Sequence, residues 1–337
     1  MDIRLDTMQN LLEVDHLKKH FPIYGGVFRK KIGYVYAVDD VSLSIQEGKT
    51  LGLVGESGCG KTTVGRSILR LIEPDSGAIR FMGQDMATMP HRRLRGIRKH
   101  MQIIFQDPFE SLDARQTIGD ILEEPFAIHQ VGSVSERRMA VRNLLDRVGI
   151  SGTAVSRFAH EFSGGQRQRI GIARAIALNP RLIVCDEPVS ALDVSIQSQI
   201  VNLLLELQRE MKLSYLFIAH NLAVVKHISD DVAVMYLGRI VEHTDSESLY
   251  AAPLHPYTQA LISAIPIPDP SRKRKRFQLA GDVPSPANPP AGCHFHPRCP
   301  FALEICKTVY PTMTATPRSD EKIHMVACHR AGTVSLL

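Results

Sequence analysis

A glycine-rich stretch near the start of the chain has the residue types needed to hold a polyphosphate. Its sequence, GESGCGKT, matches the pattern G-x-x-x-x-G-K-[ST] and lies between the apolar run TLGLVG and a predicted helix. The glycines allow backbone N–H groups to surround phosphates at the positive end of the helix dipole. Lys61 would reach the β and γ phosphates, and the Thr62 hydroxyl could ligate Mg²⁺. The expected nucleotide-binding residues of this loop are Gly55, Glu56, Ser57, Gly58, Cys59, Gly60, Lys61, Thr62 and Thr63.

Two adjacent carboxylates follow a second apolar run. Asp186 and Glu187 end RLIVCDE, which we predict to be a buried strand. Such a strand would deliver Asp186 to the phosphate side of a sheet, where it could hold Mg²⁺. Glu187 is placed to orient or deprotonate an attacking water. An acidic pair that merely ends a strand is the alternative, and the preceding glycine-rich loop favours the catalytic interpretation.

A second phosphate-facing motif, FSGGQ, lies between the two. Ser163 is a good helix N-cap, and Gly164 and Gly165 leave backbone N–H groups bare at the opening of the helix. With this motif the chain resembles the ATPases of the ATP-binding-cassette (ABC) family, in which FSGGQ is the signature. In that family two cassettes pack head to tail, and each signature closes on the γ-phosphate held by the other. The signature residues here are Ser163, Gly164, Gly165 and Gln166.

Further motifs of the family occur in the family's order. Gln106 in IIFQDP matches the Q-loop glutamine, which senses the γ-phosphate and Mg²⁺ in that family. Ser190 and Asp193 in SALD match the D-loop. His220 in FIAHN matches the switch histidine, with a histidine that merely ends a strand as the alternative.

The resemblance also implies roles at the rest of the nucleotide site. Phe21 in LKKHF falls where the family places an aromatic side chain that stacks on adenine. Tyr24, Tyr34 and Tyr36 are close enough in sequence to compete with it. The implied Mg²⁺ ligands are Thr62, Gln106 and Asp186, and the implied catalytic residues are Glu187 and His220.

The C-terminal part narrows the resemblance to one branch of the family. LHPYTQALISAIP and GDVPSPANPPAGCHFHPRC resemble the tails of ATPase subunits of dipeptide and oligopeptide importers, with nickel and glutathione importers as related alternatives. The resemblance implies ATP-driven peptide uptake at the cytoplasmic side of a bacterial inner membrane. It also implies three kinds of partner: a second ATPase subunit, expected to be a paralogue, two membrane permease subunits, and a periplasmic substrate-binding protein.

Four cysteines near the C-terminus have the spacing C-x5-C-x6-C-x21-C: Cys293, Cys299, Cys306 and Cys328. Zinc sites generally use C-x2-4-C pairs, and bacterial ferredoxins use C-x2-C-x2-C, so the spacing leaves zinc, an iron–sulfur cluster and packed thiols open. The resemblance to peptide-importer tails favours a four-iron four-sulfur cluster. The nearby histidines could be alternative ligands, and we expect them to be solvated loop residues: His294, His296, His324 and His329.

The composition excludes several other classes of protein. The 337 residues are 44% hydrophobic and 22% charged, and no apolar run approaches the roughly eighteen residues of a membrane-spanning helix. The start lacks the apolar region of a signal peptide, and two cysteines lie far from the other four, so we expect a soluble chain in a reducing compartment. Cys59 is interpreted as a space-filling residue, with a reactive thiol as the alternative.

Nucleic acid is not expected as a partner. The basic run RKRKR at 272–276 is typical of a solvated linker, and no basic stripe with interleaved aromatics occurs. A soluble ABC ATPase acting on nucleic acid, ribosomes or cluster assembly is the alternative, but such proteins usually carry two cassettes or long coiled coils. A P-loop kinase is opposed by FSGGQ.

The alternation of strand and helix patterns predicts the elements that carry these motifs. Predicted strands at 101–106, 181–186, 214–220 and 231–238 alternate with predicted helices at 165–177, 194–212 and 221–228. We expect an α/β, doubly wound P-loop core of ABC type, with an antiparallel β layer built from short strands in 11–55 and a helical subdomain at about 110–165. The expected domains are the ATPase at 1–250 and a C-terminal extension at 251–337, in which prolines are dense and DVPSPANPPAG has no periodicity.

Overall fold

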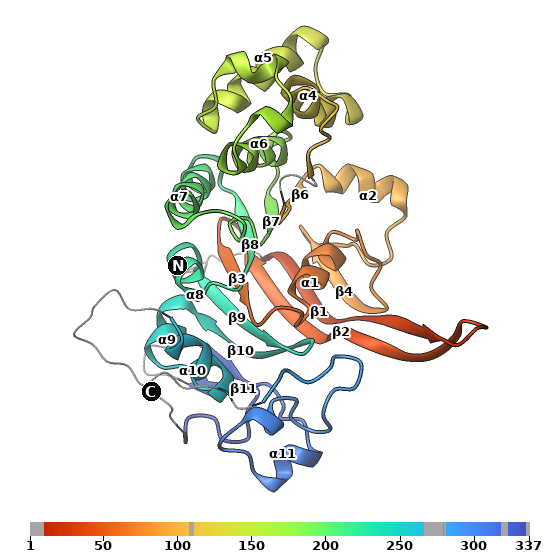
Figure 1. Cartoon of the computed structure of the whole chain (residues 1–337), viewed down its shortest axis with the longest axis vertical. Coiled ribbons are helices and arrows are strands. Elements are labelled where there is room, and N and C mark those ends of the chain that lie inside the picture. The colour runs from red at the N-terminus through yellow and green to blue at the C-terminus, as the bar shows by residue number, and fades with distance from the viewer. Residues whose placement is uncertain (1–9, 108–110, 266–278, 280, 318–322, 335–337) are drawn as a thin grey trace, which may run out of the picture. The chain divides into compact units, whose positions relative to one another are not determined.

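The computed structural model describes residues 10–107, 111–265, 279, 281–317 and 323–334 (Figure 1). The basic run at 272–276 therefore lies outside the described residues. The chain forms two compact units, each built from several segments: unit 1 comprises 1–10, 45–50 and 88–218, and unit 2 comprises 11–44, 51–87 and 219–337. Within the described part of the chain, no helix combines the length and the apolar character needed to cross a bilayer.

Unit 1 contains a parallel set of three strands in the order β6-β7-β8. These are β6 (Met101–Ile104), β7 (Leu182–Asp186) and β8 (Ser214–Ala219). Every residue of β7 and β8 is buried, as is expected for parallel strands covered on both faces. Burial on both faces explains why their sequences are continuous apolar runs.

The helices of unit 1 begin at well-defined caps. Thr117 with Asp120, and Ser133 with Glu136, form capping boxes at the starts of α4 and α5. Figure 1 shows α4, α5 and α6 next to one another. The helical elements of this unit are α2 (His91–Arg98), α4 (Ile118–Ile128), α5 (Val134–Arg147), η1 (Gly152–Ser156), η2 (Ala159–Glu161), α6 (Gly164–Ile176) and α7 (Val194–Met211).

Unit 2 contains an antiparallel sheet of order β2-β1-β4-β5. Its strands are β1 (Asn10–Gly25), β2 (Lys30–Gln46), β4 (Ser76–Phe81) and β5 (Gln84–Asp85). The prediction of short strands was wrong for the first two, which have 16 and 17 residues and form a long hairpin (Figure 1). Around their turn the side chains are largely exposed, so backbone pairing continues where no apolar alternation marks it.

A second group of strands in unit 2 has the order β11-β12-β10-β9-β3. β3 (Thr50–Val54) pairs parallel with β9 (Asp231–Tyr236), and the other neighbours are antiparallel: β10 (Arg239–Asp245), β12 (Ile323–Val326) and β11 (Thr314–Pro317). The sequence predicted no strand beyond 250, because four-residue strands are too short to show a period. The C-terminal extension thus adds two strands to β10.

The helices of unit 2 are short. They are α1 (Lys61–Ile68), α8 (Leu222–Ile228), α9 (Ser246–Ala251), α10 (Pro256–Ser263), η3 (His296–Arg298) and α11 (Glu304–Thr308). Helix α1 ends at Ile68, and Arg70, just beyond it, has a left-handed backbone with φ of 50°.

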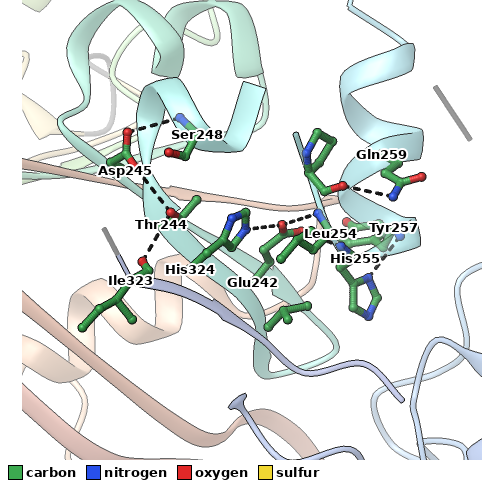
Figure 2. Close-up of polar contacts among 12 residues, drawn as sticks. Glu242, Thr244, Asp245, Ser248, Leu254, His255, Tyr257, Gln259, Ile323 and His324 are labelled. Atoms are coloured by element: carbon green, nitrogen blue, oxygen red, sulfur yellow. Dashed lines mark hydrogen bonds and ion pairs between the residues drawn. The ribbon is translucent and has the colours of Figure 1, made fainter. Parts of the chain in front are cut away.

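A buried carboxylate fixes the extension to β10 (Figure 2). Glu242 accepts hydrogen bonds from the backbone N–H of Leu254 (2.6 Å) and of His255 (2.9 Å), where the chain enters α10. Its Oε1 also lies 2.6 Å from Nε2 of His324 on β12. Both side chains are fully buried. One carboxylate therefore ties together β10, the start of α10 and β12.

Candidate functional site

The glycine-rich loop of unit 2 follows β3 and ends at the start of α1, as predicted. A Cβ added to Gly60 would lie 1.9 Å from the carbonyl oxygen of Ala37, and one added to Gly55 would lie 2.2 Å from that of Met235. These close backbone approaches require glycine at both positions. The Lys61 side chain is buried, and its Nζ donates to the carbonyl oxygens of Gly55 (2.8 Å) and Glu56 (3.0 Å). The loop thus curls around its lysine.

Cys59 lies inside this loop as a buried thiol. Burial raises its pKa, although the neighbouring Lys61 acts in the opposite direction. The carbonyl oxygen of Cys59 accepts from Gly238 N–H at 2.9 Å. These contacts favour the space-filling interpretation over a reactive thiol.

Unit 1 brings together the predicted acidic pair and the predicted Q-loop residue. Asp186, at the end of β7, is 1% exposed, and Glu187 follows it. The Nε2 atom of Gln106 donates to Oε2 of Glu187 at 3.2 Å. The Ser190 hydroxyl donates to the carbonyl oxygen of Glu187 at 3.1 Å. Three motifs predicted separately therefore meet at one carboxylate.

The signature motif opens α6 in the predicted way. Ser163 is the N-cap, and it exchanges hydrogen bonds with Gln166: Ser163 N–H donates to Oε1 (3.0 Å) and Gln166 N–H donates to Oγ (3.4 Å). Gly164 and Gly165 are partly exposed. A Cβ on Gly165 would lie 2.7 Å from Cγ2 of Ile196 on α7, so this glycine allows two helices to approach. The backbone N–H groups at the helix start can face a phosphate.

Arg167 is a supporting residue that the sequence reasoning missed. It is 8% exposed, and it donates to the carbonyl oxygens of Ala159 (Nε, 2.8 Å) and His160 (Nη2, 3.0 Å). These bonds fix the segment that leads into the signature. The sequence around Arg167 contains no feature that distinguishes a buried arginine from an exposed one.

The remaining predicted residues lie at three places. His220, in unit 2, follows β8 directly and is exposed. Asp193, in unit 1, is the N-cap of α7. Thr62 and Thr63 lie in the first turn of α1, and Ser57 and Gly58 lie between the two structural glycines of the loop.

The aromatic candidates for adenine stacking separate into two groups. Tyr34 and Tyr36 lie around His20, with ring centroids 6.3 and 4.6 Å from the histidine ring. Phe21 is the next residue on β1, and neighbouring side chains of a strand point to opposite faces. It lies under the ammonium of Lys19 and is 36% exposed. Tyr24 is 61% exposed near the hairpin turn.

The four C-terminal cysteines line one cavity in unit 2. Cys293, Cys299, Cys306 and Cys328 share it with Phe295, Phe301, His255, His296, His329 and Arg330, and none of the four forms a disulfide. Burial raises the pKa of Cys293 to about 12 and also raises the pKa values of Cys299 and Cys328. We name this the four-cysteine cavity.

The geometry of the four-cysteine cavity bears on what it could hold. Among the described residues, no three or more His, Cys, Asp or Glu side chains are grouped closely enough for one metal ion. A zinc ion needs four ligands within about 2.3 Å of its centre, whereas a four-iron cluster holds its thiolates farther apart. The four cysteines thus line one cavity without forming such a group.

The prediction of solvated histidines was wrong for His324. It lies on β12 and is fully buried, with its Nε2 atom against the Glu242 carboxylate on the neighbouring strand. His294 packs against Tyr310, with ring centroids 5.2 Å apart, and lies outside the lining of the four-cysteine cavity. His296 and His329 line it.

Comparison with known families gives two matches along the chain. Residues 38–190 match the ABC transporter family, and residues 241–306 match the C-terminal region of oligopeptide/dipeptide transporters. The chain is 54% identical over 326 residues to the oligopeptide transport ATP-binding protein AppF of Bacillus subtilis, covering 96% of this chain and 98% of that protein. It is 51% identical over 319 residues to the probable peptide ABC transporter ATP-binding protein y4tS of Sinorhizobium fredii, covering 95% and 89%.

Solved structures give the same result for the fold. One is cbiO1 from Clostridium perfringens, part of the ABC transporter complex cbiONQ, with a TM-score of 0.62 and 26% identity over 72% of this chain and 91% of that chain. Another is the ATP-binding cassette MJ0796 in a dimeric post-hydrolysis state bound to ADP and Pi, with a TM-score of 0.62 and 26% identity over 70% and 98%. These likenesses confirm the predicted fold class.

Proposed function

The chain belongs to the ABC transporter family, and we propose that it is the ATP-hydrolysing subunit of a membrane importer for dipeptides or oligopeptides. The observation that carries the proposal is that one chain matches both the ABC transporter family and the C-terminal region of oligopeptide/dipeptide transporters. Peptide is favoured over nickel or glutathione because the relatives are named for peptide transport.

The residues of the two units support specific roles. Lys61 and the loop amides would hold the phosphates, Glu187 would orient the water, and His220 would contact the γ-phosphate. Mg²⁺ supplies charge neutralisation on the phosphates when it is bound. The ion would be held by Thr62, Gln106 and Asp186. Phe21 would stack on adenine. The nucleotide of the partner cassette would be contacted by the signature and D-loop residues: Ser163, Gly164, Gly165, Gln166, Ser190 and Asp193.

The partners follow from the same role. A second ATPase subunit, a paralogue of this chain, would complete the head-to-tail pair, and two permease subunits would form the membrane path. A periplasmic binding protein would deliver the peptide. The chain would then be peripheral on the cytoplasmic face of the inner membrane.

The test is peptide uptake by the whole importer. A strain carrying Lys61→Ala in the chromosomal copy should accumulate a labelled dipeptide at less than a tenth of the wild-type rate, since the loop would lose its phosphate-binding charge. A pulldown of the tagged wild-type chain in detergent should recover two permease chains. Recovery of ribosomes or DNA, or uptake that is unchanged in the variant, would contradict the proposal.

We also propose that the four-cysteine cavity holds a four-iron four-sulfur cluster. Support comes from the convergence of Cys293, Cys299, Cys306 and Cys328 on one cavity whose other walls include two phenylalanines. The role of the cluster would be structural, because four thiolate ligands from separate parts of the extension would be joined through it.

Anaerobic purification tests the cluster. The wild-type chain should contain about four irons and four sulfides, with visible absorbance typical of a cluster. Cys306→Ser should reduce the iron content by more than half. A colourless, iron-free chain with four thiols that titrate with a disulfide reagent would reject the cluster. Zinc recovered instead of iron would mean that the four cysteines bind zinc.

A further inference from the structure

A residue of the cysteine-bearing loop contacts the phosphate-binding loop directly. Arg298 ends η3, between Cys293 and Cys299, and its side chain is 7% exposed. Its Nη1 and Nη2 atoms donate to Oε2 (2.7 Å) and Oε1 (3.1 Å) of Glu56, which lies 242 positions earlier in the glycine-rich loop. The guanidinium and carboxylate therefore form a two-bond, largely buried pair. Arginine is well suited to this geometry because its donors form a planar fork.

The same extension also holds the backbone of Glu56. Its N–H donates to the hydroxyl of Tyr257 on α10 at 2.9 Å. Tyr257 is itself fixed: its N–H donates to Nδ1 of His255, at the helix start that Glu242 holds (Figure 2). Its ring packs 5.5 Å from that of Phe295, three residues before Arg298. The extension thus grips Glu56 at both its amide and its carboxylate.

Glu56 is also joined to the phosphate-binding lysine. Lys61 Nζ donates to the Glu56 carbonyl oxygen at 3.0 Å. A free carboxylate at this position would place a negative charge beside a site for a polyphosphate, and like charges repel most strongly where water is partly excluded. Pairing with Arg298 offsets that charge and fixes the direction of the side chain.

We propose that Arg298 is a positioning residue for nucleotide binding, through which the four-cysteine extension sets the affinity of the glycine-rich loop for ATP. The inference rests on the proposed role of that loop as the phosphate site. Because Arg298 adjoins Cys299, a displacement of the loop between Cys293 and Cys299 would reach the Glu56 carboxylate through this pair.

Equilibrium binding of a fluorescent ATP analogue to the full-length chain tests the proposal. Arg298→Ala should weaken binding by about tenfold, because the carboxylate is left unpaired beside the phosphates. Adding Glu56→Gln to that variant removes the charge, and the double variant should recover to within about threefold of wild type. A role in packing alone would give no such recovery, since the glutamine restores no contact of the missing arginine.

Two control variants keep the outcomes separate. Arg70→Ala removes an arginine of similar burial, 8% exposed, that lies outside the glycine-rich loop. This arginine donates to both carboxylate oxygens of Glu73, at 3.0 and 2.9 Å. The affinity of the Arg70→Ala variant for the ATP analogue should stay within twofold of wild type. Lys61→Ala should abolish binding, and failure there would overturn the phosphate site itself. If Lys61→Ala abolishes binding as expected, two results would overturn the role of Arg298. One is wild-type affinity in Arg298→Ala. The other is a double variant, Arg298→Ala with Glu56→Gln, that binds as weakly as Arg298→Ala alone.

Discussion

Glu187 has an unusual backbone at the position where chemistry is expected. Its φ is 48°, in the left-handed region that non-glycine residues rarely adopt. Its N–H donates to the carbonyl oxygen of Ile218 at 3.0 Å, and its own carbonyl accepts from Ser190. These bonds hold the conformation and leave the carboxylate directed to Gln106. A strained, well-supported acidic residue is typical of a functional site.

Replacing this carboxylate should separate hydrolysis from binding. Glu187→Gln keeps the size of the side chain but removes the carboxylate proposed to orient or deprotonate the water, so ATP hydrolysis by the assembled importer should fall about a hundredfold or more. The affinity of the chain for an ATP analogue should stay within about threefold. Glu210→Gln, an exposed carboxylate on α7, is the control and should hydrolyse ATP normally. Normal hydrolysis by Glu187→Gln would exclude Glu187 as the base.

Cys59 should be chemically inert in the folded chain. Its pKa is raised by burial, so the thiolate fraction at pH 8 is smaller than that of an exposed cysteine. Alkylation by iodoacetamide, followed by peptide mass mapping, should be at least about tenfold slower than in the chain unfolded in urea. Equal rates in the two states would support a reactive thiol instead.

At the residue scale, the sequence predicted the residues that belong to recognisable motifs and missed contacts that only the folded backbone brings together. The need for glycine at Gly55 and Gly60 follows from the loop pattern, and the structure gives the backbone contacts that explain it. The burial of Arg167 and of His324 depends on carbonyl or carboxylate partners from other segments. No spacing within the sequence reports those partners.

At the scale of elements, Glu242 is the residue that organises the extension. Three donors from two segments, the backbone N–H groups of Leu254 and His255 and the ring of His324, converge on it. A buried carboxylate with several hydrogen bonds is tolerated, but removing it leaves each donor without its acceptor. The stability of α10 and β12 should therefore depend strongly on this one side chain.

Glu242→Ala should lower the free energy of unfolding by about 3–5 kcal/mol, because it leaves a buried imidazole and two amides without their acceptor. Urea unfolding followed by circular dichroism measures the change. Glu247→Ala, an exposed acidic residue on the adjoining α9, should change stability by less than about 0.5 kcal/mol. A loss below 1 kcal/mol for Glu242→Ala would show that the extension is held by other contacts.

The elements that the sequence missed share a physical cause. The alternation of buried strands and helices between 165 and 236 was predictable because continuous apolar runs mark β7, β8 and β9. The strands TATP and IHMV have four residues each and lie in a proline-rich segment. Strands β1 and β2 continue beyond their buried parts into a largely exposed turn. Four-residue strands are too short to show a period, and the largely exposed part of the β1–β2 hairpin carries no apolar alternation.

At the scale of the whole molecule, the extension and the glycine-rich loop belong to one unit. Residues 219–337 group with 11–44 and 51–87, while the signature and the acidic pair belong to the other unit. The pair Arg298–Glu56 joins positions 242 residues apart, so the sequence could predict both motifs but not their contact. The glycine-rich loop and the FSGGQ motif thus belong to different units.

The proposed role of the FSGGQ motif in the partner's nucleotide site predicts how a signature variant behaves. If Ser163 serves the nucleotide of the partner subunit, Ser163→Arg should leave the affinity of the isolated chain for an ATP analogue within twofold of wild type. In the assembled importer the same variant should lower ATP hydrolysis to half or less, because a bulky cation at the N-cap blocks the helix start from the partner's γ-phosphate. Ser198→Arg, at an exposed position on α7, is the matched control and should hydrolyse ATP normally. A loss of nucleotide affinity in the isolated Ser163→Arg chain would mean that the signature serves the phosphates of its own subunit, which would contradict the head-to-tail arrangement.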